Sequence, residues 1–167
     1  ANHYYLMGHR SYVSYDKYLK TGPYNFGWLD TKPDFVEHYA YQQGLLVSYW
    51  DTSVADNNQS QHPGQGRNVI VDAHPKPIIN SVTGAPWRAR VQMYDAPFST
   101  VKKTDSMTLH TNGKPSRIEG QRGNPTFDDR QKYWYAELPN HGVKLPGVGF
   151  TARVVQEKGT SLQVKIN

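Results

Sequence analysis

The chain has 167 residues, 37% of them hydrophobic and 13% aromatic, so it is long enough for one ordinary domain with a core rich in rings. Its formal net charge of +5 is mild and its Lys and Arg residues are scattered, which argues against nucleic-acid binding. No stretch approaches the roughly 20 apolar residues of a membrane span, and the absence of Cys excludes a thiol nucleophile and Cys-ligated zinc. We therefore expect a single domain over residues 1–167 with no membrane span.

The first half of the chain alternates between apolar and polar residues with the period of a strand. The opening ANHYYLM (residues 1–7) is typical of a strand. Because a native chain rarely begins inside a strand, we expect a domain cut from a longer precursor. GLLVSYW (44–50) and NVIVDA (68–73) are denser apolar runs, and they predict central strands. DFVEHYAY (34–41) fits a short helix and a strand equally well.

The second half continues the alternation. Asn112-Gly113 predicts a type I′ hairpin, and Pro115 confines the strand that follows to an edge or a late start. Three further segments each predict a half-buried antiparallel strand: WRARVQM (87–93), KYWYAEL (132–138) and SLQVKIN (161–167). The sequence therefore predicts an all-β fold, an antiparallel, jelly-roll-like β-sandwich with long loops and little helix.

A long polar loop joins the two dense apolar runs. A loop of this length costs ordering entropy and is uncommon unless it carries function or a bound ion. Calcium binds about six to eight hard oxygen atoms, and side chains that offer them are concentrated here: Asp51, Asp56, Asn57, Asn58 and Asp72. Their spacing is not that of an EF-hand. We treat them as a candidate calcium site, with turn capping by Asp and Asn as the alternative.

Histidine is the second candidate metal ligand. His62 and His74 flank the second dense run, and with an Asp they could form a zinc site. A zinc peptidase needs two His one helical turn apart with a general-base Glu between them. The chain contains no His-Glu-x-x-His, so we expect no catalytic residue and no zinc within it.

Aromatic residues crowd the first 28 positions, and Tyr24, Phe26 and Trp28 are the candidates for surface binding. Rings displayed in a row on a sandwich face would stack on sugars. The alternative is that these rings cover the sheet or pack against an adjacent domain, since a chain with few aliphatic residues needs its rings inside.

Several long motifs of the chain resemble those of a single family: TGPYNFGW (21–28), the DNN…HPGxG…VDAHP pattern of residues 56–75, and FDDR followed by KYWYAE (127–137). Through them the chain resembles the C-terminal, non-catalytic region of the immune inhibitor A family of secreted bacterial zinc metallopeptidases. This chain differs from the family pattern at Gly8-His9, where the family-like sequence has Glu-Asn. A contact made by that Glu in relatives would be lost here.

The resemblance implies a secreted, extracellular precursor whose zinc ligands and general base lie upstream of Ala1. Residues 1–167 would then be an accessory domain that packs on the catalytic domain of the same precursor, stabilises it and helps to position substrate, with calcium as the candidate cofactor. The residues leave two alternatives open, a stand-alone module that binds a protein or polysaccharide surface, and a small sandwich hydrolase that uses a pair of carboxylates.

Overall fold

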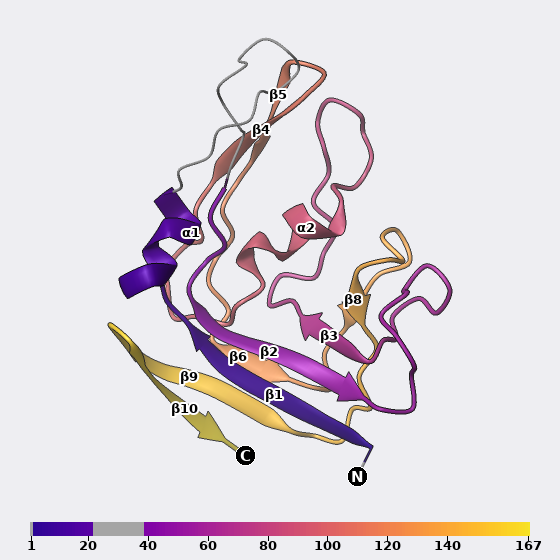
Figure 1. Ribbon diagram of the computed structural model, residues 1–167, viewed down its shortest axis with the longest axis vertical. Coiled ribbons are helices and arrows are strands. Elements are labelled where there is room, and N and C mark those ends of the chain that lie inside the picture. Colours follow the sequence, from indigo (N-terminus) through magenta and orange to yellow (C-terminus); the bar gives the residue numbers. More distant parts are fainter. Residues whose placement is uncertain (1, 22–38) are drawn as a thin grey trace.

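The computed structural model describes residues 2–21 and 39–167, and its architecture is mostly strand (Figure 1). All pairings between its strands are antiparallel, which confirms the predicted all-β class. The helical segments in this part of the chain are short: η1 (Ser14–Lys17), α1 (Tyr18–Thr21), α2 (Ala89–Gln92) and η2 (Met93–Asp95). Within the described ranges, no helix has the length and apolar character needed to cross a membrane.

The first sheet has the strand order β1-β2-β3. Strand β1 (His3–Arg10) pairs with β2 (Gly44–Asp51) over its full length, and β2 pairs with β3 (Asn68–Val71). The prediction of a central strand is therefore confirmed for β2 but is wrong for β3, which lies at an edge. The apolar density of β3 has another cause, because Val69 and Val71 are both buried against the core.

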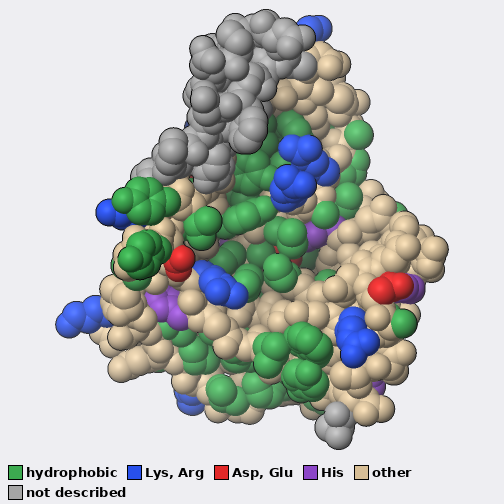
Figure 2. Space-filling view, viewed as in Figure 1, with side chains coloured by type: hydrophobic (Ala, Val, Ile, Leu, Met, Phe, Trp, Pro, Cys, Tyr) green, Lys and Arg blue, Asp and Glu red, His purple; other side chains and the backbone are tan. Residues whose placement is uncertain are grey.

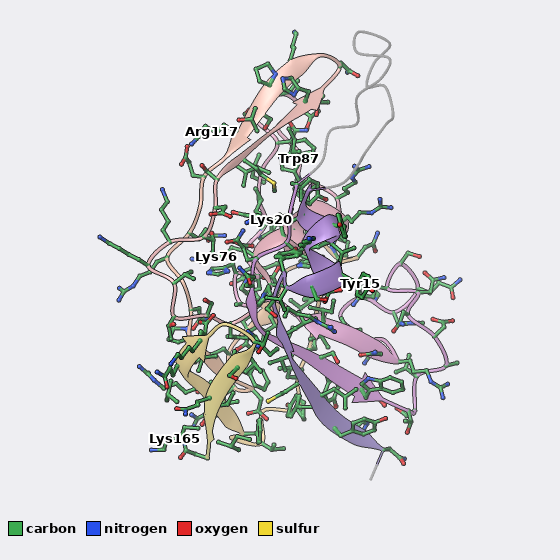
Figure 3. All side chains as sticks on the ribbon, turned by 60° about the vertical axis from the view of Figure 1, so that its left-hand side comes forward. Tyr15, Lys20, Lys76, Trp87, Arg117 and Lys165 are labelled. Atoms are coloured by element: carbon green, nitrogen blue, oxygen red, sulfur yellow. The ribbon has the colours of Figure 1, made fainter. Side chains whose placement is uncertain are left out.

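The second sheet has the order β10-β9-β6, formed by β10 (Ser161–Ile166), β9 (Thr151–Lys158) and β6 (Thr126–Asp128). The strand predicted over 161–167 is thus confirmed as β10. Figure 3 shows this sheet to one side of β1 and β2. A cluster of buried hydrophobic side chains from both sheets, which we call the main core, joins the two sheets. The two sheets share this core without closing into one complete sandwich.

Aromatic rings meet around Phe127 in the main core, beside aliphatic residues such as Val47 and Val154. Phe127, which is fully buried, has its ring centroid 5.1 Å from that of Tyr5, 5.6 Å from that of Phe98 and 5.8 Å from that of Tyr133. These rings come from β1, β6, β7 (Tyr133–Trp134) and the segment after η2. A core of edge-to-face rings explains how a chain with few aliphatic residues still excludes water.

A hairpin projects from the two sheets at the top of Figure 1. It consists of β4 (Met107–Thr111) and β5 (Lys114–Ile118), joined by Asn112 and Gly113, whose φ angles are 51° and 75°. Both values are positive, as a type I′ turn requires, and the predicted hairpin is confirmed. Its base packs in a second, smaller core with the buried residues Val91, Tyr94, Leu109 and Ile118.

The strand predicted over residues 87–93 is wrong, because this segment forms α2 and the start of η2. The reason is the side chain of Gln92, which is 1% exposed. Its Oε1 accepts the N–H of Ile78 (2.8 Å), and its Nε2 donates to the carbonyls of Ile78 (3.1 Å) and Trp87 (2.9 Å). A helical turn buries Val91 and Gln92 together, whereas a strand would place them on opposite faces.

The strand predicted over residues 132–138 is shorter than expected. Only Tyr133–Trp134 form β7, which pairs with β8 (Gly142–Val143). Backbone hydrogen bonds from Leu138 N to Tyr135 O and from His141 N to Leu138 O, both 3.1 Å, then turn the chain. Of the segment 34–41, for which helix and strand were both open, residues 34–38 lie outside the described residues, and Tyr39 to Tyr41 are in neither a helix nor a strand.

Candidate functional site

The polar loop between β2 and β3 is held by its own Asp and Asn side chains. Asp51 Oδ1 accepts the N–H of Ser53 at 2.9 Å, and the hydrogen bonds from Ser53 hold the pKa of Asp51 below its ordinary value. Asp56 Oδ1 accepts the N–H of Asn58 at 2.7 Å and lies 3.0 Å from Nε2 of His62. Both carboxylates therefore cap turns two residues ahead of themselves.

The two asparagines of the loop have similar tasks. Asn57 Oδ1 accepts the N–H of Asn68 at 2.8 Å, which ties the loop to the first residue of β3. Asn58 Oδ1 accepts the hydroxyl of Ser60 at 2.5 Å. Each of these oxygens has a local partner, as the turn-capping alternative requires, and calcium binding by the loop stays a prediction.

Asp72 lies apart from these turns, at the end of β3, and is fully buried. Its Oδ1 accepts the N–H of His74 at 2.8 Å, and its Oδ2 lies 2.9 Å from Nε2 of His141. Asp72, His74 and Asp95 place ligand-type atoms within 4.8 Å of one another, the one group of three or more His, Asp or Glu side chains that does so among the described residues. With His141 they form what we call the buried Asp–His cluster.

The imidazole of His74 faces oxygen atoms on both sides. Nδ1 is 2.7 Å from the carbonyl oxygen of Asp95, and Nε2 is 2.9 Å from the carbonyl oxygen of Arg122. A carbonyl oxygen only accepts, and a neutral imidazole carries just one N–H. The geometry therefore fits the doubly protonated, cationic ring, which donates to both carbonyls and leaves neither nitrogen to a metal ion.

Asp95 supplies the second carboxylate of the cluster. Its Oδ2 accepts Nε2 of Gln121 at 3.3 Å and lies 3.4 Å from Nδ1 of His74, whereas its buried Oδ1 has no partner. Burial raises the pKa of Asp95 to about 7; the charge on His74 opposes this rise and the charge on Asp72 adds to it. Where Asp95 is ionised, a cationic His74 beside it offsets part of the cost of burying its charge.

The burial of the cluster limits what it can do chemically. The exposed fractions of its four residues are 0% for Asp72, 9% for His74, 0% for Asp95 and 5% for His141. The two carboxylates are fully enclosed, whereas His141 lines a surface pocket together with Asn68. The cluster joins the end of β3, the helical segment η2, the backbone at Arg122 and the segment before β8, so its role is to hold these segments together.

Sequence reasoning identified two members of this cluster but assigned them to separate sites, Asp72 to calcium and His74 to zinc. It missed Asp95 as a partner of His74, and it missed His141 altogether. The residues that meet are 21 positions apart for His74 and Asp95 and 69 positions apart for Asp72 and His141. No local spacing signals a contact over such separations.

The aromatic residues near the start of the chain differ in how deeply they are buried. Tyr24, Phe26 and Trp28 lie outside the described residues. Tyr5 points into the main core, where its hydroxyl donates to Asp129 Oδ2 at 3.1 Å. Tyr4, on the opposite face of β1, is 41% exposed. Rings from this region therefore serve both the core and the surface.

Comparisons with known proteins match this chain to one family and to several named relatives. The model of the immune inhibitor A-like metallopeptidase VEG domain matches residues 1–165. The chain is 33% identical over 149 residues to pre-pro-metalloprotease PrtV from two strains of Vibrio cholerae serotype O1, which covers 89% of this chain and 15% of that protein. It is 32% identical over 129 residues to immune inhibitor A from Bacillus thuringiensis subsp. alesti, covering 75% of this chain and 19% of that protein.

Fold and cluster together define an antiparallel all-β domain with an enclosed ionic network. The chain belongs to the family of immune inhibitor A-like metallopeptidase VEG domains, and the resemblance seen in the sequence motifs is confirmed. It spans less than a fifth of the length of the curated relatives that it matches.

Proposed function

We propose that this chain is an accessory domain of a secreted metallopeptidase precursor, in which a separate catalytic domain carries out proteolysis. The observation that carries the proposal is the family match over residues 1–165, in a chain that corresponds to only 15% and 19% of two metallopeptidase relatives. Most of each relative lies outside the match and has room for a catalytic domain. The chain itself lacks the His-Glu-x-x-His that a zinc peptidase of this kind needs.

The role that we propose for the domain is to stabilise the enzyme and to help hold substrate in position. Both tasks need a rigid body rather than a reactive group. The rings packed around Phe127 and the charge-paired hydrogen bonds of the buried Asp–His cluster fit this requirement, since each joins segments that are distant in the sequence.

The test compares the whole precursor with a version from which residues 1–167 have been removed. We expect the shortened enzyme to cleave a small chromogenic peptide when freshly prepared and to lose that activity faster on heating. The isolated chain should cleave neither the peptide nor casein. Proteolysis by the isolated chain would contradict the proposal.

A second measurement separates the accessory role from the alternative of a stand-alone binding module. The isolated chain is passed over insoluble polysaccharide, and its retention is compared with that of a protein of similar size and charge. Specific retention, together with unchanged thermal inactivation of the shortened enzyme, would favour a surface-binding module over a stabilising one.

A further inference from the structure

The outer face of the β1-β2-β3 sheet is apolar, although it points away from the main core. An antiparallel sheet with one solvated face normally carries polar side chains on that face. The strand register gives the positions on what we call the outer β1–β3 face: Tyr4, Leu6, Gly8, Arg10, Gly44, Leu46, Ser48, Trp50, Asn68 and Ile70. Arg10, at the end of β1, is the one charged residue among them. The composition is that of a sheet covered on both sides.

Part of this face is open to solvent in the isolated chain. Tyr4 is 41% and Leu6 is 46% exposed, and the ring of Tyr4 stacks on that of Trp50 with 5.7 Å between centroids. Figure 2 shows hydrophobic side chains gathered over β1 and β2. Contiguous exposed apolar surface of this kind marks interaction sites in soluble proteins.

The second sheet provides an internal comparison. The residues on its outer face include Arg153 of β9 and Gln163 and Lys165 of β10, all of them exposed. Val155 of β9 is an isolated aliphatic residue there, 51% exposed. The apolar outer β1–β3 face is therefore a local property, and the overall composition of the domain does not explain it.

The outer β1–β3 face continues into a pocket of about 380 Å³. Arg10, Leu46 and Ile70 belong to both. Met93, Ala96 and Pro97 add apolar lining, and Asp16 and Gln42 lie at the same pocket. A pocket beside a flat apolar face is the arrangement in which one large side chain of a partner becomes the anchor of an interface.

We propose that the outer β1–β3 face and its pocket dock onto another domain of the same precursor. This rests on the proposed accessory function. The family relatives are several times longer than this chain, so each supplies further domains at high effective concentration. A sugar would need several polar groups beside the rings. Arg10 lies at the opposite end of β1 from Tyr4, so the hydrogen-bonding side chains near the rings, among the non-aromatic positions of this face, are Ser48 and Asn68. A protein surface with an apolar centre is the better complement.

The proposal is tested by hydroxyl-radical footprinting of the whole precursor and of the isolated chain, read out by mass spectrometry. We expect oxidation of Tyr4 and Leu6 to be several-fold slower in the precursor. Val155 and Ile166, which are 51% and 59% exposed in the second sheet, should be oxidised equally in both samples. Equal oxidation of Tyr4 and Leu6 in both samples, or protection of Val155 instead, would overturn the proposal.

A matched pair of variants tests the same surface by function. Leu6→Glu places a charge on the outer β1–β3 face, and Val155→Glu places one at a similarly exposed position of the second sheet. Neither should lower the melting temperature of the isolated chain by more than a few degrees. In the precursor, Leu6→Glu should restore oxidation of Tyr4, whereas Val155→Glu should leave its protection intact. Identical footprints for the two variants would count against docking through this face.

Sedimentation of the isolated chain tests whether a second copy of the chain covers the outer β1–β3 face instead. We expect a monomer, and a dimer that Leu6→Glu dissociates would overturn the proposal in favour of self-association. The thermal inactivation assay on the same precursor samples separates this inference from the proposed function. Loss of stability on removal of the domain, with no protection of Tyr4 or Leu6, would leave the accessory role standing and reject only the docking surface.

Discussion

Asp56 illustrates, at the scale of one residue, how a capping side chain and a metal ligand can be told apart. Its Oδ1 already accepts the N–H of Asn58, two residues ahead. Asp128 makes the same local contact, with Oδ1 accepting the N–H of Arg130 at 3.0 Å. The two carboxylates have the same turn chemistry, but only Asp56 belongs to the candidate calcium site.

This similarity gives a controlled prediction for calcium. Asp56→Ala should lower the melting temperature more in calcium than in chelator, because only the calcium-bound protein would lose a ligand in addition to the turn cap. Asp128→Ala should cost the same in both conditions, about 1 kcal/mol for a lost cap. Thermal unfolding monitored by circular dichroism measures both, and equal losses for Asp56→Ala would refute calcium ligation there.

At the scale of elements, the β4–β5 hairpin depends on backbone conformation more than on packing at its tip. Gly113 has a φ of 75°, a region that costs a residue with a Cβ about 1 to 2 kcal/mol. Gly8 of β1 has open space around an added Cβ, and its φ is not positive. The two glycines therefore differ in the property that the turn requires.

We expect Gly113→Ala to destabilise the protein by about 1 kcal/mol or more and Gly8→Ala to leave stability unchanged or slightly raised. Urea denaturation of the two variants beside the unaltered chain measures the difference. A loss for Gly8→Ala as large as that for Gly113→Ala would show that the turn geometry is not the cause.

The elements also show what the sequence can and cannot predict. The hairpin at Asn112-Gly113, the central strand β2 and the terminal strand β10 were predictable, because turn chemistry, a dense apolar run and a period of two are all local signals. Residues 87–93 alternate just as well, yet they form a helix once the amide of Gln92 finds Ile78 and Trp87 in the folded protein. For the same reason the sequence indicated Asp72 and His74 but not the partners that they meet.

At the scale of the whole molecule, the buried Asp–His cluster links stability to pH. The pKa of Asp95 is raised from 3.8 to about 7, so the folded chain binds this proton more tightly than the unfolded chain. The stabilisation from this group is complete below about pH 4 and is lost as the pH rises through about 7.

Asp95→Asn should remove this dependence, because the amide keeps the shape of the side chain but does not titrate. We expect the free energy of unfolding of the unaltered chain to fall, relative to that of the variant, as the pH rises from about 4 to about 7. Urea denaturation across this range measures it. Asp16→Asn, an exposed change on η1, serves as control, and a constant offset for Asp95→Asn at every pH would contradict the prediction.

The wide sequence separations inside the buried Asp–His cluster also bear on when the chain can fold. His141, the partner of Asp72, lies 69 residues further along, and the backbone of Arg122 lies 48 residues beyond His74. A ribosome or a secretion channel releases these partners late, and long-range contacts form slowly because their loops must close first. A partly emerged chain can offer Asp72 the N–H of His74, but it lacks the His141 partner of the second carboxylate oxygen. The cluster can therefore form only after the segment around His141 has become available.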